Sequence, residues 1–195
     1  AATYYVKNGG NDNADGLSDA TAWATINKVN NQTFAAGTTI LFKRDNIWRE
    51  EVSLIPDVGG NNRYVTYGAY GTGNKPKLLG STLENSTSDW TVYSGNVWQN
   101  NDASFSNVNV GNLIFNNEEL YGIYKTSLSA VTSQGDFFFD VNNRRLYLYS
   151  ISNPATYYSN IECALDRPIV NFGSNKGYII LENLDFRYTA GHGTR

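Results

Sequence analysis

The sequence predicts an all-β protein with one short helix, in which a solenoid carrying an inserted antiparallel segment is favoured over a sandwich. Asparagine is the commonest residue, and glycine, serine, threonine and tyrosine are also frequent. Asparagine and glycine tolerate the left-handed backbone of tight turns, while β-branched and aromatic residues suit pleated strands. Of the 195 residues 41% are hydrophobic, which is enough to form the buried core of one domain.

Short apolar runs follow one another along the chain, separated by clusters of glycine and asparagine such as residues 59–62, 71–74 and 173–175. Such clusters mark turns, and the runs between them have the length of strands. The strands predicted in this way cover residues 3–7, 39–43, 48–55, 64–70, 77–79, 90–93, 112–115, 136–140, 146–149, 169–172, 178–182 and 184–188.

One helix is predicted, over residues 21–30. Ala22, Ile26 and Val29 recur there at helical spacing. Ser18 or Asp19 precedes this segment, and either side chain can cap a helix N-terminus.

Two all-β architectures fit this pattern of strands. Residues 136–150 have the alternation of an antiparallel hairpin, as in a sandwich. Residues 39–42 and 177–186 are instead short apolar bursts that end in asparagine or charged corners, which is typical of solenoid coils. These bursts favour a solenoid. Because no strict repeat is visible, a sandwich stays open.

The solenoid makes a specific prediction about strand pairing. Two sets of strands should pair in parallel with each other. The segment that the chain forms between these two sets should be largely antiparallel. The first set is 39–42, 52–55, 65–67 and 78–79, the second is 161–164, 169–170, 178–181 and 184–186, and the antiparallel segment is 82–160.

Composition excludes several classes of protein. Fifteen basic and eighteen acidic residues give a net charge of −3, which argues against a nucleic-acid-binding protein. No stretch approaches the ~20 apolar residues of a membrane-spanning helix. With one cysteine, Cys163, and one histidine, His192, neither an internal disulfide nor a structural zinc site can form. The sequence has no methionine, and Ala1–Thr3 reads as a terminus left after removal of a signal peptide, so we expect a secreted, extracellular protein.

A candidate calcium loop precedes the predicted helix. Asn11, Asn13, Asp15 and Asp19 place oxygen-bearing side chains at relative positions 1, 3, 5 and 9, with glycine at position 6. This spacing resembles an EF-hand loop, whose hard oxygen ligands suit Ca²⁺, but the acidic residue expected at position 12 is missing. Turns in which asparagine and aspartate bond their own backbone explain the same residues.

No catalytic residue is assigned from the sequence. Glu50–Glu51 and Glu118–Glu119 are acidic pairs, but adjacent residues of a strand point to opposite faces, so solvated strand faces explain them better than a catalytic pair. His192 has the residue type of a general base, yet it lies in a Gly-His-Gly turn. Cys163 reads as a small buried hydrophobic residue.

Four aromatic residues are candidates for carbohydrate binding: Trp90, Trp98, Tyr121 and Tyr124. They lie in surroundings rich in asparagine and serine, and flat rings beside amide groups can hold a sugar by stacking and hydrogen bonds. The alternative is that these rings form the hydrophobic core of an inserted subdomain at residues 82–160.

Seven stretches carry a likeness to a known family: residues 4–6, 10–16, 22–26, 36–45, 47–50, 67–76 and 178–188. Together they resemble the secreted right-handed parallel β-helix proteins of the pectate-lyase-like superfamily. The likeness is strongest over residues 3–80, moderate over 136–195 and weak over 81–135. Thr38 stands where the family usually has aspartate, and Asp45-Asn46 where it has Gly-Asp.

The resemblance implies a right-handed parallel β-helix with a short N-terminal capping helix and an inserted antiparallel β subdomain. In this plan residues 1–38 form a cap, 39–81 a first coil, 82–160 the inserted antiparallel segment and 161–195 further coils. It also implies the N-terminal part of a longer polysaccharide lyase or glycoside hydrolase that acts on an extracellular, acidic polysaccharide. We expect the catalytic coils to follow Arg195 and this chain alone to be inactive. The alternative is a non-catalytic exported β-helix, such as an adhesin or a filament subunit.

The expected partners are a polysaccharide and, through the C-terminal face of the β-helix, the remainder of a parent chain or a second copy. An open solenoid end leaves backbone groups and apolar side chains without partners, which favours pairing.

Overall fold

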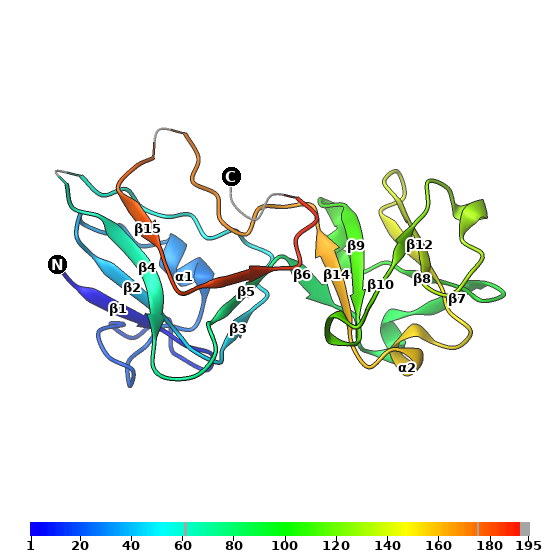
Figure 1. Cartoon of the computed structure of the whole chain (residues 1–195), viewed down its shortest axis with the longest axis horizontal. Coiled ribbons are helices and arrows are strands. Elements are labelled where there is room, and N and C mark those ends of the chain that lie inside the picture. Colours follow the sequence, from blue (N-terminus) through cyan, green and yellow to red (C-terminus); the bar gives the residue numbers. More distant parts are fainter. Residues whose placement is uncertain (61, 175, 192–195) are drawn as a thin grey trace. The chain divides into compact units, whose positions relative to one another are not determined.

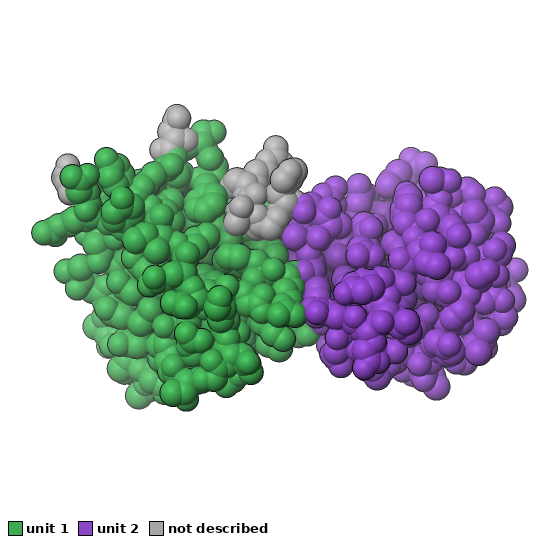
Figure 2. Space-filling model, viewed as in Figure 1, with its two compact units in different colours: residues 1–79, 168–187, 193–195 green, residues 80–167, 188–192 purple. Residues whose placement is uncertain are grey.

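A computed structural model describes residues 1–60, 62–174 and 176–191 (Figure 1). Strands dominate and the helices are short, so the prediction of an all-β protein is confirmed. Among the described residues, none of the helices is long and apolar enough to cross a membrane. The described chain forms two compact units, coloured separately in Figure 2: unit 1 contains residues 1–79 and 168–187, and unit 2 contains residues 80–167 and 188–191.

Unit 1 contains two sheets in which every strand pair is parallel. The first has the order β1-β2-β4-β15 and the second the order β16-β5-β3. The chain passes from the first sheet to the second three times, from β2 to β3, from β4 to β5 and from β15 to β16 (Figure 1). The bounds are β1 (Thr3–Val6), β2 (Thr39–Lys43), β3 (Ile47–Trp48), β4 (Val65–Tyr70), β5 (Lys77–Leu79), β15 (Ile179–Leu181) and β16 (Asp185–Arg187).

Left-handed residues form the corners between the two sheets of unit 1. Asp45 (φ 61°) separates β2 from β3, Gly71 (φ 83°) separates β4 from β5, and Asn183 (φ 56°) separates β15 from β16. Aspartate, asparagine and glycine tolerate this backbone, so the asparagine-rich and glycine-rich composition finds a physical reason here.

The predicted parallel pairing is confirmed at three places and wrong at one. Ile179–Leu181 pairs with β4, Asp185–Arg187 pairs with β5, and Leu54 bridges to Val170, all in parallel. Residues 161–164 instead belong to β14 (Ile161–Leu165), which is antiparallel to both of its neighbours. All five residues of β14 are buried, and a continuous apolar run indicates burial without indicating strand direction.

The core of unit 1 is built from alternating strand positions. Ile40 and Phe42 of β2, Tyr67 of β4 and Leu78 of β5 are fully buried, and the residues between them on β2 are partly exposed. Their side chains join one cluster with Trp23, Trp48, Leu54 and Val170. This alternation is what one sheet face packed on a core requires.

The helix is shorter than predicted. It is α1 (Ile26–Asn30), because the chain at Trp23 is extended and bonds to β1. The Trp23 amide donates to the Tyr5 carbonyl (2.9 Å) and the Lys7 amide to the Trp23 carbonyl (2.8 Å). The backbone of residues 21–25 therefore has partners outside any helix, so the predicted start at residue 21 is wrong.

The cap of α1 also differs from the prediction. Thr25 is the N-cap, and its hydroxyl accepts from the Lys28 amide (2.9 Å). Ser18 and Asp19 bond elsewhere, so the prediction that one of them caps the helix is wrong. Ile26 and Val29 point into the core of unit 1, as their spacing predicts.

Unit 2 is mainly antiparallel. One sheet has the order β10-β9-β14-β6 and is antiparallel throughout, and the other has the order β11-β12-β13-β8-β7 with one parallel pair, β11 with β12. The bounds are β6 (Ser81–Leu83), β7 (Thr91–Ser94), β8 (Val97–Asn100), β9 (Val110–Phe115), β10 (Leu120–Tyr121), β11 (Ile123–Tyr124), β12 (Asp136–Asp140) and β13 (Arg145–Tyr149), with α2 (Pro154–Tyr157) and 3₁₀ turns η1 (Thr87–Asp89), η2 (Ala103–Ser106), η3 (Asn116–Glu118) and η4 (Leu128–Ala130).

The two sheets of unit 2 share one hydrophobic core. Leu113 and Ile161 come from the first sheet, and Phe137 and Leu146 from the second; all four are fully buried in one cluster. In the predicted hairpin, Phe137 and Phe139 point into this core and Phe138 is partly exposed, as alternation along a strand requires.

Candidate functional site

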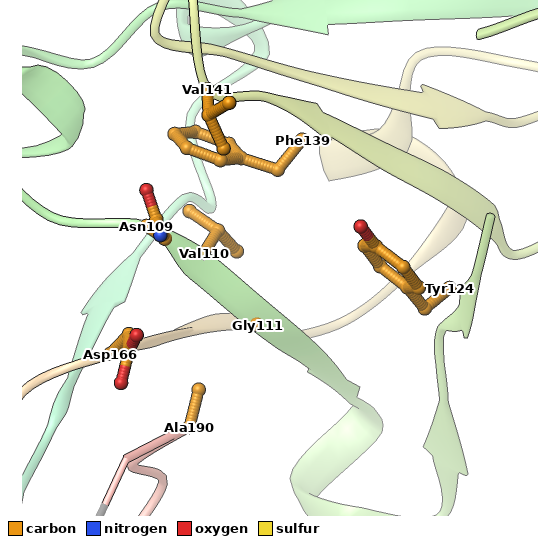
Figure 3. Close-up of a pocket in the computed structure, with 8 residues that line it drawn as sticks. All are labelled: Asn109, Val110, Gly111, Tyr124, Phe139, Val141, Asp166 and Ala190. Atoms are coloured by element: carbon orange, nitrogen blue, oxygen red, sulfur yellow. The ribbon is translucent and has the colours of Figure 1, made fainter. Parts of the chain in front are cut away.

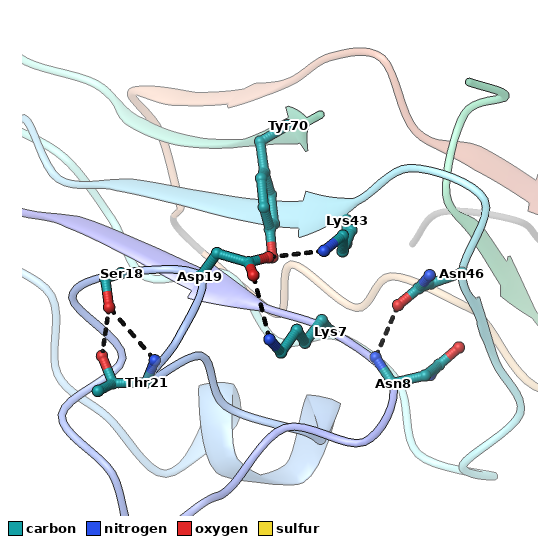
Figure 4. A network of polar contacts seen from close by, with 8 residues as sticks. All are labelled: Lys7, Asn8, Ser18, Asp19, Thr21, Lys43, Asn46 and Tyr70. Carbon is teal, nitrogen blue, oxygen red and sulfur yellow. Dashed lines mark hydrogen bonds and ion pairs between the residues drawn. The ribbon is translucent and has the colours of Figure 1, made fainter. Parts of the chain in front are cut away.

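The candidate calcium loop is organised by internal hydrogen bonds and ion pairs. Asp19 accepts from Lys43 (2.8 Å), from the Tyr70 hydroxyl (2.8 Å) and from Lys7 (3.2 Å), as Figure 4 shows. The hydrogen bonds from Lys43, Tyr70 and Lys7 hold the pKa of Asp19 well below its usual range. Two ammonium groups therefore occupy the oxygens that a cation would need.

The other residues of this loop form turns. The Asn11 side chain accepts from the Asn13 amide (2.9 Å), and the Asp15 carboxylate accepts from the Leu17 amide (2.9 Å). The bond from Leu17 is the main reason that the pKa of Asp15 is lowered. Within the described residues, no group of three or more histidine, cysteine, aspartate or glutamate side chains is arranged to hold a metal ion. Calcium binding by Asn11, Asn13, Asp15 and Asp19 stays a prediction.

The four candidate sugar-binding aromatics divide into two pairs. Trp90 is only 3% exposed, and Trp98 packs against the same core. Their indole N–H groups donate to the carbonyls of Glu84 (3.0 Å) and Ser150 (2.9 Å). Tyr121 and Tyr124 are instead 56% and 55% exposed. The tyrosines have accessible rings, whereas the tryptophans serve the core of unit 2.

Tyr124 borders a cavity of about 250 Å³ in unit 2 (Figure 3). In the figure its ring stands on one side of the cavity, and Asn109 and Asp166 stand on the other. The lining residues are Asn109, Val110, Gly111, Tyr124, Phe139, Val141, Asp166 and Ala190.

Small residues open this cavity. Gly111 of β9 lies so close to the methyl group of Ala190 that a side chain at position 111 would collide with it. Ala190 is fixed by its amide, which donates to the Leu165 carbonyl (3.0 Å). Opposite, the ring of Tyr124 packs edge-to-face on Phe137, with 5.6 Å between ring centroids. The walls are therefore held by main-chain bonds and core packing.

The polar groups of the cavity offer both donors and acceptors. Arg144 donates to the Asn109 side-chain oxygen (2.7 Å), which turns the amide NH₂ of Asn109 away from this bond. The carboxylate of Asp166 makes no hydrogen bond or ion pair with the described residues, and its backbone is fixed by a bond to the Asn109 carbonyl (2.8 Å). A ring, a free carboxylate and an amide thus converge on one pocket, and a few convergent polar groups beside an aromatic ring are typical of a small-molecule site.

A second cavity of unit 2 is strongly acidic. It measures about 210 Å³ and is lined by Glu84, Ser88, Asp89, Asn100, Asn101 and Asp102. Burial raises the pKa of Glu84 to about 7, against the hydrogen bond from Asn100, and the nearby Asp102 raises it further. A carboxyl group that titrates near neutral pH was not predicted from the sequence.

The acidic pairs, the cysteine and the histidine have other positions. The Glu50 carboxylate accepts from the Ile26 (2.6 Å) and Asn27 (3.1 Å) amides and so stabilises the start of α1; burial raises its pKa. Glu118 lies in η3 and Glu119 follows it, so this pair is not on a strand face. Cys163 is fully buried, which raises its thiol pKa. His192 lies outside the described residues.

Comparison with known proteins gives a fold but no family. No family model matches the chain, and no curated protein matches it. Among solved structures it is similar to XylC in complex with xylose, with a TM-score of 0.77 and 17% identity over 97% of this chain and 36% of that one. It is also similar to a glycoside hydrolase, with a TM-score of 0.60 and 10% identity over 97% of this chain and 51% of that one.

The chain therefore spans about a third to a half of the length of these two proteins. A GH136 lacto-N-biosidase from Eubacterium ramulus aligns with 43% of this chain and 14% of its own, at 27% identity and a TM-score of 0.37, too low to support an argument. At 17% and 10% identity, the two longer matches establish a shared fold and leave activity open.

Proposed function

We propose that this chain is the carbohydrate-recognition part of a glycoside-hydrolase-like protein that acts on an extracellular polysaccharide, and that the Tyr124 cavity holds one sugar unit. The observation that carries the proposal is the convergence of Tyr124, Asn109 and Asp166 on one pocket. The likeness in fold to a protein solved with xylose and to a glycoside hydrolase supports the choice of ligand.

The chemistry of the cavity suits a neutral sugar. The Tyr124 ring and Val110 offer an apolar face for sugar C–H groups, the Asp166 carboxylate can accept from hydroxyls, and the Asn109 amide can donate to one. A free carboxylate would repel the carboxylate of an acidic sugar. About 250 Å³ is below the ~300–1,000 Å³ of sites for drug-sized ligands, so one sugar ring fits better than two.

Xylose, glucose and galacturonate titrated into the chain, with binding followed by NMR, test this proposal. The neutral sugars should shift amides around the cavity, and Tyr124→Ala should weaken their binding about tenfold, because an aromatic contact contributes ~0.5–1.5 kcal/mol beyond its burial. Tyr157→Ala is the matched control: Tyr157 is 43% exposed in the same unit and does not line the cavity. Equal weakening by both variants, or larger shifts from galacturonate than from the neutral sugars at the amides around this cavity, would contradict the proposal.

For unit 1 we propose a parallel β-helix whose open edge pairs with a further strand. Support comes from the two parallel sheets and the three successive crossings between them. Among the described residues both β15 and β16 end their sheets, and Tyr178 is 47% and Ile180 36% exposed. An uncovered parallel edge with half-exposed apolar side chains favours association. The occupant we propose is a further coil of a parent chain or a second copy of this one.

Light scattering tests whether the open edge pairs with a second copy of the chain. The chain should associate beyond its 21.6 kDa monomer at high concentration, and Ile180→Lys should restore the monomer because a charge at the edge opposes strand pairing. Ile151→Lys serves as the control, since Ile151 is 64% exposed in unit 2. A stable monomer at every concentration would rule out self-pairing.

A further inference from the structure

Unit 1 contains a cavity of its own, of about 170 Å³, at the corner between β2 and β3. The lining of this cavity contains two lysines, whereas that of the Tyr124 cavity contains none. The lining residues are Asp45, Asn46, Ile47, Asn74, Lys75 and Lys77.

The backbone around this cavity is fixed by reciprocal bonds between two segments. The Asp45 amide donates to the Asn74 carbonyl (3.0 Å), and the Asn74 amide donates back to the Asp45 carboxylate (2.9 Å). The Lys77 amide donates to the Asn46 carbonyl (3.0 Å). Asn46 itself accepts from the Asn8 amide (2.7 Å; Figure 4). The lysines thus extend from a rigid frame.

Neither lysine of this cavity forms an ion pair with an acid among the described residues. Lys75 and Lys77 make no side-chain hydrogen bond or ion pair there. Lys7 and Lys43 differ, because both pair with Asp19. The acid beside Lys77 across the sheet is Asp185, whose carboxylate is bound by Arg187 (3.0 Å).

One acid, Asp45, does line the cavity, and one of its two carboxylate oxygens already accepts hydrogen bonds. The Asp45 carboxylate accepts twice from Asn74 through one oxygen, at 2.9 and 3.0 Å. Two ammonium groups against one carboxylate leave the lining with a net positive charge in a protein whose net charge is −3. An unpaired lysine pair in a small fixed hollow is suited to an anionic group.

We propose that this cavity binds the anionic group, a carboxylate or a sulfate, of an acidic glycan. Lys75 and Lys77 would bind the anion, and the exposed side chain of Ile47 would contact the C–H face of the sugar that bears it. The choice of a glycan rests on the proposed carbohydrate-recognition function, whereas the anion site is argued from unit 1 and does not require sugar binding at Tyr124. Together the two sites would suit a glycan of neutral sugars that carries acidic substituents.

Calorimetry with four ligands tests the proposal: an oligogalacturonide, a sulfated oligosaccharide, an uncharged oligosaccharide of equal length and inorganic sulfate. At least one acidic oligosaccharide should bind more tightly than the uncharged one, with an affinity that falls as salt rises. Lys75→Gln with Lys77→Gln should weaken this binding about tenfold, since each partly exposed ion pair contributes a few-fold. Lys75→Arg with Lys77→Arg should retain most of it.

The control removes two positive charges elsewhere in unit 1, by Lys28→Gln with Arg63→Gln. Weakening by both double variants alike would mean a general charge effect and would overturn the proposal. It would also be overturned if the uncharged oligosaccharide bound as tightly as the acidic ones, or if inorganic sulfate did. The Tyr124→Ala variant should bind the acidic oligosaccharides through this cavity as the parent chain does, which separates failure here from failure of the Tyr124 site.

Discussion

Glu84→Gln is expected to raise the free energy of unfolding of unit 2 at pH 8 by up to about 3 kcal/mol relative to the parent chain. At pH 4 the substitution should change this free energy little. The pKa of Glu84 is about 7 in the folded protein against an ordinary value of 4.5, and each unit of difference corresponds to ~1.4 kcal/mol. A group whose pKa is raised on folding stabilises the fold below its unfolded pKa. That stability is lost as the pH rises through the folded pKa.

The cause lies in the position of this carboxyl group. Glu84 is 2% exposed, so ionisation would place a charge away from water beside Asp102 and Asp89. The bond from the Asn100 amide (2.7 Å) offsets part of the cost. Glutamine keeps the shape and an oxygen that can accept this bond, and it has no charge to bury.

Urea unfolding measured from pH 4 to pH 9 checks this prediction, with hydrogen exchange at unit 2 amides to separate the two units. The parent chain should lose stability between about pH 4.5 and 7, and Glu84→Gln should not. Glu119→Gln, at an exposed position of the same unit, should follow the parent profile. Parallel profiles for the parent chain and Glu84→Gln would show that Glu84 does not carry the effect.

Much of unit 1 could be predicted because its strands and corners are encoded locally. Apolar bursts such as residues 39–42 form the strands, and left-handed Asp45 and Asn183 form corners where the pattern predicts them. The start of α1 could not be predicted in this way, because Trp23 bonds to β1 and tertiary pairing overrides helical spacing. The direction of β14 likewise depends on the path of the chain rather than on its five residues.

The candidate site shows the same division. Tyr124 could be identified from its residue type and polar surroundings, whereas Asp166 and Ala190 reach the cavity only because the chain returns beside β9. Trp90 and Tyr124 look alike as candidates in the sequence and differ in burial, 3% against 55% exposed. Burial of this kind depends on the packing of residues that are distant in the sequence into one core, as with Trp90 and Ile161.

Gly16→Ala is expected to destabilise unit 1 by about 2–5 kcal/mol, the other large effect that the structure predicts. Gly16 has φ +72°, and a methyl group there would lie 2.5 Å from the indole of Trp23. A left-handed backbone costs an ordinary residue about 1–2 kcal/mol, and overpacking of a core costs about 1–3 kcal/mol. Trp23 cannot easily move, because it stacks on Tyr4 (4.8 Å between ring centroids) and donates to the Ala14 carbonyl (3.0 Å).

Gly9→Ala separates these two costs, because Gly9 has nearly the same backbone, φ +73°, and nothing within 4 Å of an added methyl group. It should cost only the backbone part, about 1–2 kcal/mol. The measurements are urea unfolding and the exchange of the Tyr5 amide, which donates to the Gly16 carbonyl (2.8 Å). Trp23→Ala removes the whole indole that the methyl group would meet, so Gly16→Ala should cost less in that background than alone. Equal losses for Gly16→Ala and Gly9→Ala would mean that the indole yields without cost, and would contradict the tight packing of Trp23 on Gly16.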